Sequence, residues 1–192
     1  MATVFASCRK LKSIDLSKID VSKLSSANIT DMFSYCESLE NIDFQSWEGL
    51  KISTMRNTFN NCKKLKVIDI SPLDTTTAKF AALCCDCTEL ESFNGYLDYN
   101  NYSASGNMNF SFTNCPNLRQ INTIYNLGKN QYIDFKNSPY LGVVNEDYPN
   151  ARIKLTELLV TNLYDKVANG LSTGSMRLNE ATVALLTEEE IA

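Results

Sequence analysis

The chain has 192 residues, of which 44% are hydrophobic and 10% aromatic, and its formal net charge is −4. These values suit one or two folded domains, exclude an intrinsically disordered chain, and argue against a nucleic-acid partner, whose phosphates require a basic face. The sequence contains no His and only 7 Gly, so it lacks the commonest general base and any glycine-rich phosphate loop, and we expect no enzyme activity and no cofactor.

A repeat of about 26 residues organises residues 1–150. Its six equivalent positions are 28, 26, 25, 28 and 23 residues apart and are occupied by Cys8, Cys36, Cys62, Cys87, Cys115 and Ser138. A Phe lies three residues before each position, except for Cys84 in the fourth repeat, and a Leu lies three residues after it. Six residues after it comes Ile, Phe or Val, followed each time by Asp or Asn. This period is typical of leucine-rich repeats.

The local spacing predicts two elements in each repeat. The Phe-x-x-Cys-x-x-Leu spacing favours a helical or 3₁₀ turn, and the alternation in Ile68-Asp69-Ile70 favours a short strand. We therefore predict an α/β leucine-rich-repeat solenoid of about six coils, with one parallel sheet. The outer face of that sheet would carry a polar row made of Asp15, Asp43, Asp69, Asn94, Asn122 and Asn145.

The residues of these repeats resemble a known family. The segment Met32-Phe33-Ser34-Tyr35-Cys36-Glu37-Ser38-Leu39-Glu40-Asn41-Ile42-Asp43 is similar to the BspA-like leucine-rich repeats of bacterial surface proteins and of proteins carried by gut bacteriophages. Residues 68–75 match the segment that follows the cysteine in that family. The resemblance covers about residues 1–145 and implies a right-handed solenoid. Proteins with such repeats serve as adhesins, secreted proteins and virion components.

Residues 151–192 follow a different pattern and are expected to form a helix-strand-helix cap on a solenoid of residues 1–150. Leu155, Leu159 and Leu163 share one helical face, with Thr156 as N-cap and 169–170 as the stop. Residues 175–178 suit a short strand, and Asn179 suits the cap of a helix at 181–186. Thr187 and Glu190 have the spacing of a capping box. The segment is similar to one that often follows BspA-like repeats.

The cysteines and charges have structural interpretations. Five of the seven Cys occupy one repeat position, which predicts a column of buried free thiols. Cys84-Cys85-x-Cys87 is the one place for a disulfide or a metal, but without His or a second Cys pair we predict no metal. Basic residues after Cys8 and Cys62 alternate with acidic residues after the intervening cysteines, so neighbouring repeats are expected to form ion pairs.

Two surfaces are candidates for ligand or partner contact. The Asp and Asn row suits a cation or another ligand, although repeat consensus explains it without any function and is the favoured interpretation. Residues 94–150 contain 13 Asn and seven Tyr, a composition that suits adaptable contact surfaces as well as a polar, loop-rich edge. The residues that we expect to contact a glycan or protein are Tyr96, Tyr99, Asn100, Asn101 and Tyr102.

These observations favour a non-enzymatic structural or recognition protein. The leading hypothesis is a gut-bacteriophage virion component, a fibre or surface protein whose partners are other virion proteins or a host surface protein or glycan. No signal peptide is visible in residues 1–5, and we therefore expect a protein that assembles in the cytoplasm without secretion. We expect no membrane insertion, because no run approaches about 18 apolar residues. The alternative is a BspA-like adhesin domain on a bacterial cell surface.

Overall fold

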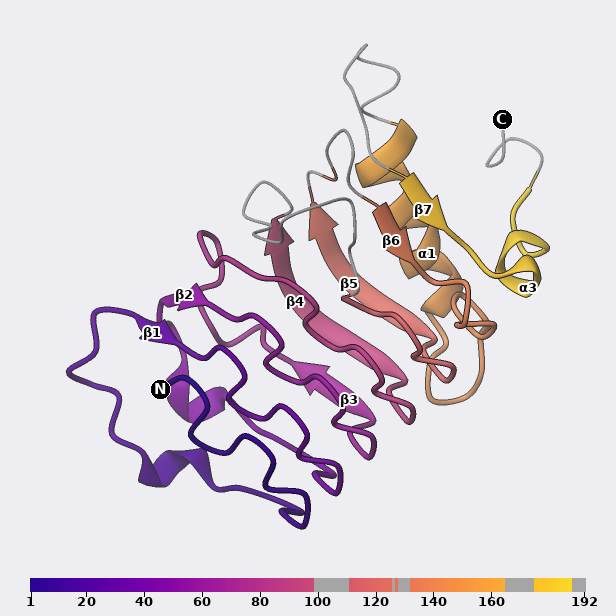
Figure 1. The fold of residues 1–192 in the computed structure, drawn as a ribbon. Helices are drawn as coiled ribbons and strands as arrows, with labels where there is room; N and C mark the ends of the chain where they lie inside the picture. Colours follow the sequence, from indigo (N-terminus) through magenta and orange to yellow (C-terminus); the bar gives the residue numbers. More distant parts are fainter. Residues whose placement is uncertain (99–110, 126, 128–131, 165–174, 188–192) are drawn as a thin grey trace.

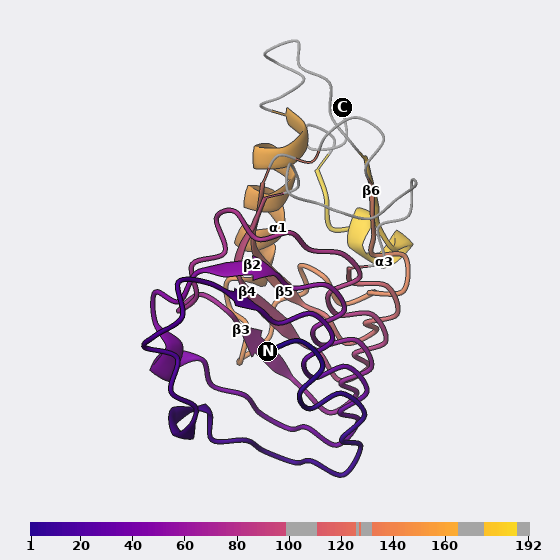
Figure 2. The same ribbon diagram turned by 60° about the vertical axis from the view of Figure 1, so that its left-hand side comes forward.

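Successive repeats lie side by side in the computed structural model, which describes residues 1–98, 111–125, 127, 132–164 and 175–187 (Figure 1). Backbone N–H groups of one repeat donate to carbonyl oxygens of the next. Phe5 N lies 3.1 Å from Met32 O, Phe33 N lies 3.0 Å from Thr58 O, and Phe59 N lies 3.0 Å from Leu83 O. The turned view shows the same order of turns along the stack (Figure 2). Backbone N–H and C=O groups of each repeat thus find hydrogen-bond partners in the neighbouring repeats.

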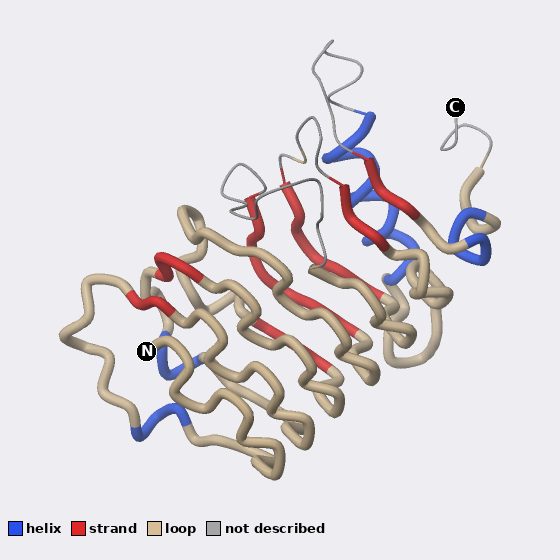
Figure 3. Tube along the Cα trace, viewed as in Figure 1, coloured by secondary structure: helices blue, strands red, loops and turns tan. Residues whose placement is uncertain are grey.

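The strands of the described residues form three separate parallel sheets (Figure 3). The first pairs β1 (Ala27–Asn28) with β2 (Ile52–Thr54), and both strands precede a Phe-x-x-Cys turn. The second sheet has the order β3 (Val67–Asp69), β4 (Ser92–Asp98), β5 (Gln120–Tyr125), and these strands follow the turn. The third pairs β6 (Tyr132–Asp134) with β7 (Ser175–Arg177).

The prediction of a leucine-rich-repeat solenoid with one continuous parallel sheet is wrong, because the sheets have only two, three and two strands. In the first two repeats the predicted strand is replaced by a turn. Asp15 Oδ1 accepts the Ser17 N–H at 3.0 Å and caps the 3₁₀ helix η1 (Leu16–Lys18). Asp43 Oδ1 accepts the Gln45 N–H at 2.8 Å at the start of η2 (Gln45–Trp47). An Asp side chain that bonds the backbone two residues on favours a turn over a strand.

The Phe-x-x-Cys-x-x-Leu segments form consecutive tight turns with no helix. In the second repeat Cys36 N donates to Phe33 O, and Leu39 N donates to Cys36 O, both at 3.0 Å. The residue before the cysteine has a positive φ in five repeats, at Ser7, Tyr35, Asn61, Asp86 and Asn114. The predicted 3₁₀-type bonding is therefore present, but in these five turns a left-handed residue prevents a helix from continuing.

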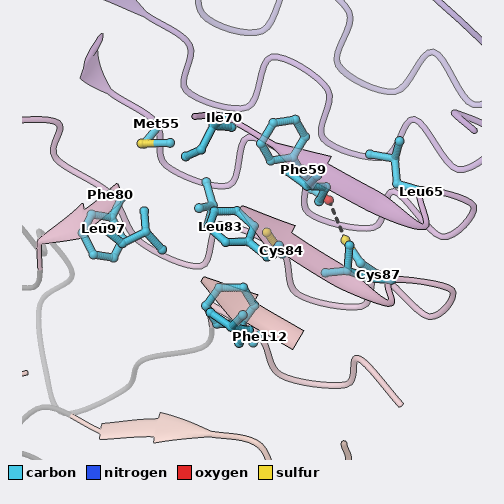
Figure 4. Close-up of a cluster of buried hydrophobic side chains, with 14 of the residues drawn as sticks. Met55, Phe59, Leu65, Ile70, Phe80, Leu83, Cys84, Cys87, Leu97 and Phe112 are labelled. Carbon is cyan, nitrogen blue, oxygen red and sulfur yellow. Dashed lines mark hydrogen bonds between the residues drawn. The ribbon is translucent and has the colours of Figure 1, made fainter. Parts of the chain in front are cut away.

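The core lies inside the stack and consists of the repeated apolar positions. Phe33, Phe59 and Phe112 are fully buried, and the rings of Phe33 and Phe59 stack with their centroids 6.1 Å apart. Figure 4 shows this packing around Phe59, Leu83 and Phe112. The predicted burial of the repeat positions is confirmed in the middle of the stack. It is wrong at Cys8, which is exposed. In the last repeat Val144, six residues after Ser138, is 53% exposed.

The C-terminal residues pack against the last repeats. Helix α1 (Ala151–Leu159) continues into a π-helical turn, η4 (Val160–Tyr164), and contacts β5. The helix begins before the predicted N-cap: Thr156 lies inside it, and Asn150 is the cap residue. The predicted strand is confirmed as β7, and Asn179 caps α3 (Glu180–Val183) by accepting the Ala181 N–H. Residues 169–170 and Glu190 lie outside the described residues.

Among the helices of the described residues, none has both the length and the apolar character that crossing a membrane requires.

Candidate functional site

A pocket of about 430 Å³ opens on the sheet of β3, β4 and β5. Five polar residues line it, and they come from all three strands and from the turn after β3: Asp69, Ser71, Asn94, Tyr96 and Asn122. Leu73 and Gly95 complete the lining. A pocket of this size with convergent polar groups and some apolar surface is the common form of a small-ligand site.

Strand register brings the amides of the pocket together. Asp69 is the register partner of Asn94, and Asn94 is the register partner of Asn122. Asn122 Nδ2 donates a hydrogen bond to Asn94 Oδ1. The side chains of the repeat consensus therefore meet here across three neighbouring strands, as cross-strand neighbours on one face do.

A β-bulge in β4 positions Tyr96. Asn94 pairs with Asn122 and Leu97 pairs with Ile124. Two residues of β4 therefore lie between these pairs, whereas β5 has one residue there. Gly95, with a φ of 144°, lies in the bulge, and a Cβ atom there would lie 2.1 Å from Ile70 Cγ1. Only glycine allows this approach of β4 to the turn after β3. The bulge adds a residue to the strand at the point where Tyr96 enters the pocket lining.

The hydrogen bonds of the pocket residues leave both donors and acceptors available. Asp69 Oδ1 accepts the Ser71 N–H at 2.9 Å, and among the described residues its Oδ2 has no partner. Within the same described part of the chain, neither Ser71 Oγ nor Asn94 Nδ2 bonds to a protein atom. Tyr96 is half-buried, and its hydroxyl donates to Asp98 Oδ2 at 3.4 Å. The pocket thus offers a carboxylate oxygen, a hydroxyl and an amide N–H₂ group.

The predicted sheet-face row is only partly assembled. Asp69, Asn94 and Asn122 lie together in the pocket, but Asp15 and Asp43 lie in turns outside any strand. Hydrogen bonds from Ser17 hold the pKa of Asp15 below its ordinary value. Asn145 also lies outside the strands, where its Oδ1 accepts the Tyr148 N–H at 2.8 Å. These three side chains are explained by the turns that they stabilise.

Of the five predicted contact residues, the structure describes Tyr96 alone, and Tyr99, Asn100, Asn101 and Tyr102 lie outside the described residues. Tyr96 joins the sheet-face residues in one pocket, a combination that the sequence patterns did not indicate. Ser71, Leu73 and Gly95 were not predicted as site residues. The signal for them was Gly95 itself, because a glycine inside a strand pattern often marks a bulge.

The cysteines fill the core rather than the pocket. All seven are free thiols, and six of them are buried, including Cys85 outside the repeat frame. Burial raises the pKa of Cys36 to about 11 and that of Cys85 to about 12. In the described part of the chain, no three Cys, Asp or Glu side chains group in a way that can hold a metal ion.

The predicted ion pairs between neighbouring repeats are confirmed. Glu37 lies 3.5 Å from Arg9 of the preceding repeat and 3.0 Å from Lys63 of the following one. Lys64 pairs with Glu89, and Lys66 lies 3.7 Å from Glu91. All of these side chains are at least partly exposed, so the pairs contribute little stability individually. Their alternating sign instead favours the observed register of repeats.

Comparison with known families identifies the repeat region. A family model described as "Mycoplasma protein of unknown function, DUF285" matches residues 1–125, well over half of the chain. The chain belongs to the DUF285 family. In this DUF285 protein the match includes all of the residues that line the pocket, from Asp69 to Asn122. Comparison with curated proteins found no match, and comparison with solved structures also found none.

Proposed function

We propose that this DUF285 protein is a non-enzymatic structural and recognition protein, a virion component of a gut bacteriophage that contacts host surface molecules or neighbouring virion proteins. The observation that carries the proposal is the pocket on the β3–β4–β5 sheet, where a carboxylate, a hydroxyl, amides and a tyrosine converge. Such a set suits binding. It combines hydrogen-bond donors, hydrogen-bond acceptors and an aromatic side chain.

The scaffold supports a recognition role because the pocket is held by neighbouring strands. Hydrogen bonds of β3, β4 and β5 fix the backbone of Asp69, Asn94 and Asn122 through their register. Side chains on such elements are pre-organised, so less conformational entropy is lost when a ligand binds.

The virion assignment rests on the resemblance of residues 32–43 and 68–75 to BspA-like repeats, which occur in proteins of gut bacteriophages. The DUF285 match supports the coarser statement that these repeats form one family unit. The same repeats also occur in bacterial surface proteins. A BspA-like adhesin domain on a bacterial cell is therefore the second candidate function.

Immunoelectron microscopy distinguishes the two candidates. Antibodies raised against the purified protein are applied to purified phage particles and to uninfected host cells, with pre-immune serum as the control. Labelling of particles, together with peptides of the chain in the particle proteome, is the expected result. Labelling of uninfected cells alone would support the adhesin instead, and labelling of neither would overturn both candidates.

A further inference from the structure

From the pocket chemistry we infer that the β3–β4–β5 site binds an uncharged saccharide, rather than a sialylated or otherwise anionic one. This inference deepens the proposed recognition function and rests on it. Three observations carry the inference: the hydrogen-bonding groups that remain available, the tyrosine beside them, and the charge of the lining.

The available groups match the hydroxyls of a sugar. A sugar hydroxyl both donates and accepts, so it needs an acceptor and a donor close together. Asp69 Oδ2 supplies the acceptor and Asn94 Nδ2 the donor; neither has a partner among the described residues. Ser71 is exposed, and its hydroxyl can act in either role. Hydrogen bonds to a charged acceptor are stronger than neutral ones, which makes Asp69 the anchor.

Tyr96 supplies the apolar part of the site. A pyranose ring has a face of C–H groups, and an aromatic side chain offers that face a large surface with little conformational freedom to lose. Tyr96 and Leu73 both line the pocket, and the bulge at Gly95 holds the backbone of Tyr96 in place. The Thr75 hydroxyl adds a second restraint by donating to the Tyr96 carbonyl oxygen at 2.7 Å.

The charge of the lining sets the specificity. Asp69 is the one ionisable acid among the described residues that line the pocket, and no Lys or Arg is among them. A carboxylate or sulfate on the ligand would face this negative charge without a cation to balance it, and like charges in a partly enclosed site repel. A neutral sugar carries no such cost. The volume of about 430 Å³ suits a short saccharide rather than a long chain.

The test measures binding of the full chain to an array of neutral oligosaccharides and their sialylated counterparts, with the best neutral hit quantified by calorimetry. Tyr96→Ala removes the aromatic surface. Asp69→Asn removes the charge but keeps an oxygen that can accept the Ser71 N–H. Asp43→Asn is the matched control, since Asp43 makes the same turn outside the pocket. Tyr35→Ala is the control for loss of a partly exposed tyrosine.

We expect wild type to bind neutral members and to reject sialylated ones. Tyr96→Ala and Asp69→Asn should each weaken neutral binding by about tenfold, and both controls should leave it unchanged. Asp69→Asn should also reduce the difference in affinity between neutral oligosaccharides and their sialylated counterparts. Binding of no neutral oligosaccharide, a preference for sialylated members, or equal loss in the controls would each overturn the inference.

The two proposals fail in distinguishable ways. If the protein is found in particles but binds no sugar, the saccharide inference fails and the virion function stands. If the wild-type protein binds neutral sugars through Tyr96 but the antibodies label neither particles nor cells, the saccharide site stands and the proposed function fails.

Discussion

The thiol of Cys62 donates a hydrogen bond of 3.1 Å to the carbonyl oxygen of Phe33 in the preceding repeat. Cys87 makes the same bond to Phe59 at 3.0 Å, drawn in Figure 4. At the sixth repeat position Ser138 makes a comparable bond of 2.9 Å, with the Cys115 carbonyl oxygen as acceptor. The repeat position therefore requires a small buried donor, and either a thiol or a hydroxyl meets that requirement.

This relationship predicts that serine is tolerated at one cysteine and not at another. Cys62→Ser should cost about 1 kcal/mol, because its hydroxyl keeps an acceptor. Cys84→Ser should cost about 2–3 kcal/mol, because Cys84 Sγ donates to no acceptor among the described residues and the buried hydroxyl would stay unsatisfied. Urea denaturation of both variants measures the difference in the free energy of unfolding. Equal losses would show that the bond to Phe33 has no energetic role.

The left-handed turn residues predict a stabilising substitution. Tyr35 has a φ of 60°, whereas the equivalent positions of the next three repeats hold Asn61, Asp86 and Asn114. Asn and Asp tolerate this conformation better than Tyr. Tyr35→Asn should therefore raise the free energy of unfolding by about 0.5–1 kcal/mol, and Asn61→Ala should lower it by a similar amount. A lower melting temperature for Tyr35→Asn would mean that its side-chain packing outweighs the strain.

Substitution of Gly95 should lower the free energy of unfolding more than substitution of Gly49. A Cβ at Gly95 would lie 2.1 Å from Ile70 Cγ1, whereas at Gly49, with a φ of 73°, nothing lies within 4 Å. Gly95→Ala should cost about 3 kcal/mol, from the overlap as well as the backbone, and Gly49→Ala about 1 kcal/mol, from the backbone alone. Thermal unfolding of the two variants measures the difference. Comparable losses would imply that β4 moves away from Ile70 without penalty.

Thiol accessibility predicts which cysteine reacts first. Cys8 is exposed and the other six cysteines are buried. Iodoacetamide at pH 8 should add one group to the native protein, on Cys8, and six more only after unfolding. Peptide mass spectrometry locates the group, and Cys8→Ser provides a native control that should gain none. Modification of Cys85 at the same rate as Cys8 would contradict the described packing.

The buried thiols also predict a loss of stability at alkaline pH. Burial raises the pKa of Cys36 to about 11, above the value of about 8.5 for an unfolded thiol, so the folded state holds this proton more tightly. The associated stability is fully present below about pH 8.5 and is lost as the pH rises towards 11, by up to about 1.4 kcal/mol per pH unit. Melting temperatures from pH 8 to 11 measure the dependence of stability on pH. Cys36→Ala should reduce this dependence by the share of one thiol, because the other five buried thiols still lose stability in the same pH range. An unchanged dependence would assign the loss to groups other than Cys36.

The sequence predicted the core better than the sheets, for a physical reason. Phe33, Cys36 and Leu39 are buried because repeated apolar residues stack on their equivalents, so periodicity alone locates them. Strands depend on the neighbouring repeat. Asp15 and Asp69 each accept the N–H two residues on, but only Asp69 ends a strand, since β4 lies beside it. The predicted burial of Cys8 was wrong for a related reason, because burial depends on a neighbouring repeat that the local pattern does not specify.

The candidate site shows the same division. The polar consensus identified Asp69, Asn94 and Asn122, and the local composition identified Tyr96. Their meeting in one pocket depends on strand register and on the bulge beside Gly95, which no local pattern fixes. Ser71 joins them in the lining from the turn after β3, where its N–H donates to Asp69 Oδ1.

The pairing of β6 with β7 has a consequence for synthesis on the ribosome. Most repeats find their neighbour within about 25–28 residues of chain, as in Cys62 and Cys87, so they can stack as the nascent chain emerges. Strand β6 cannot pair until β7 has been synthesised, because the register partner of Tyr132 is Ser175, 43 residues later in the chain. Folding of the growing chain therefore halts with this edge unpaired until the last part of the chain has been translated. A ribosome that stalls before Ser175 would release a product with an exposed strand edge, and such edges promote aggregation.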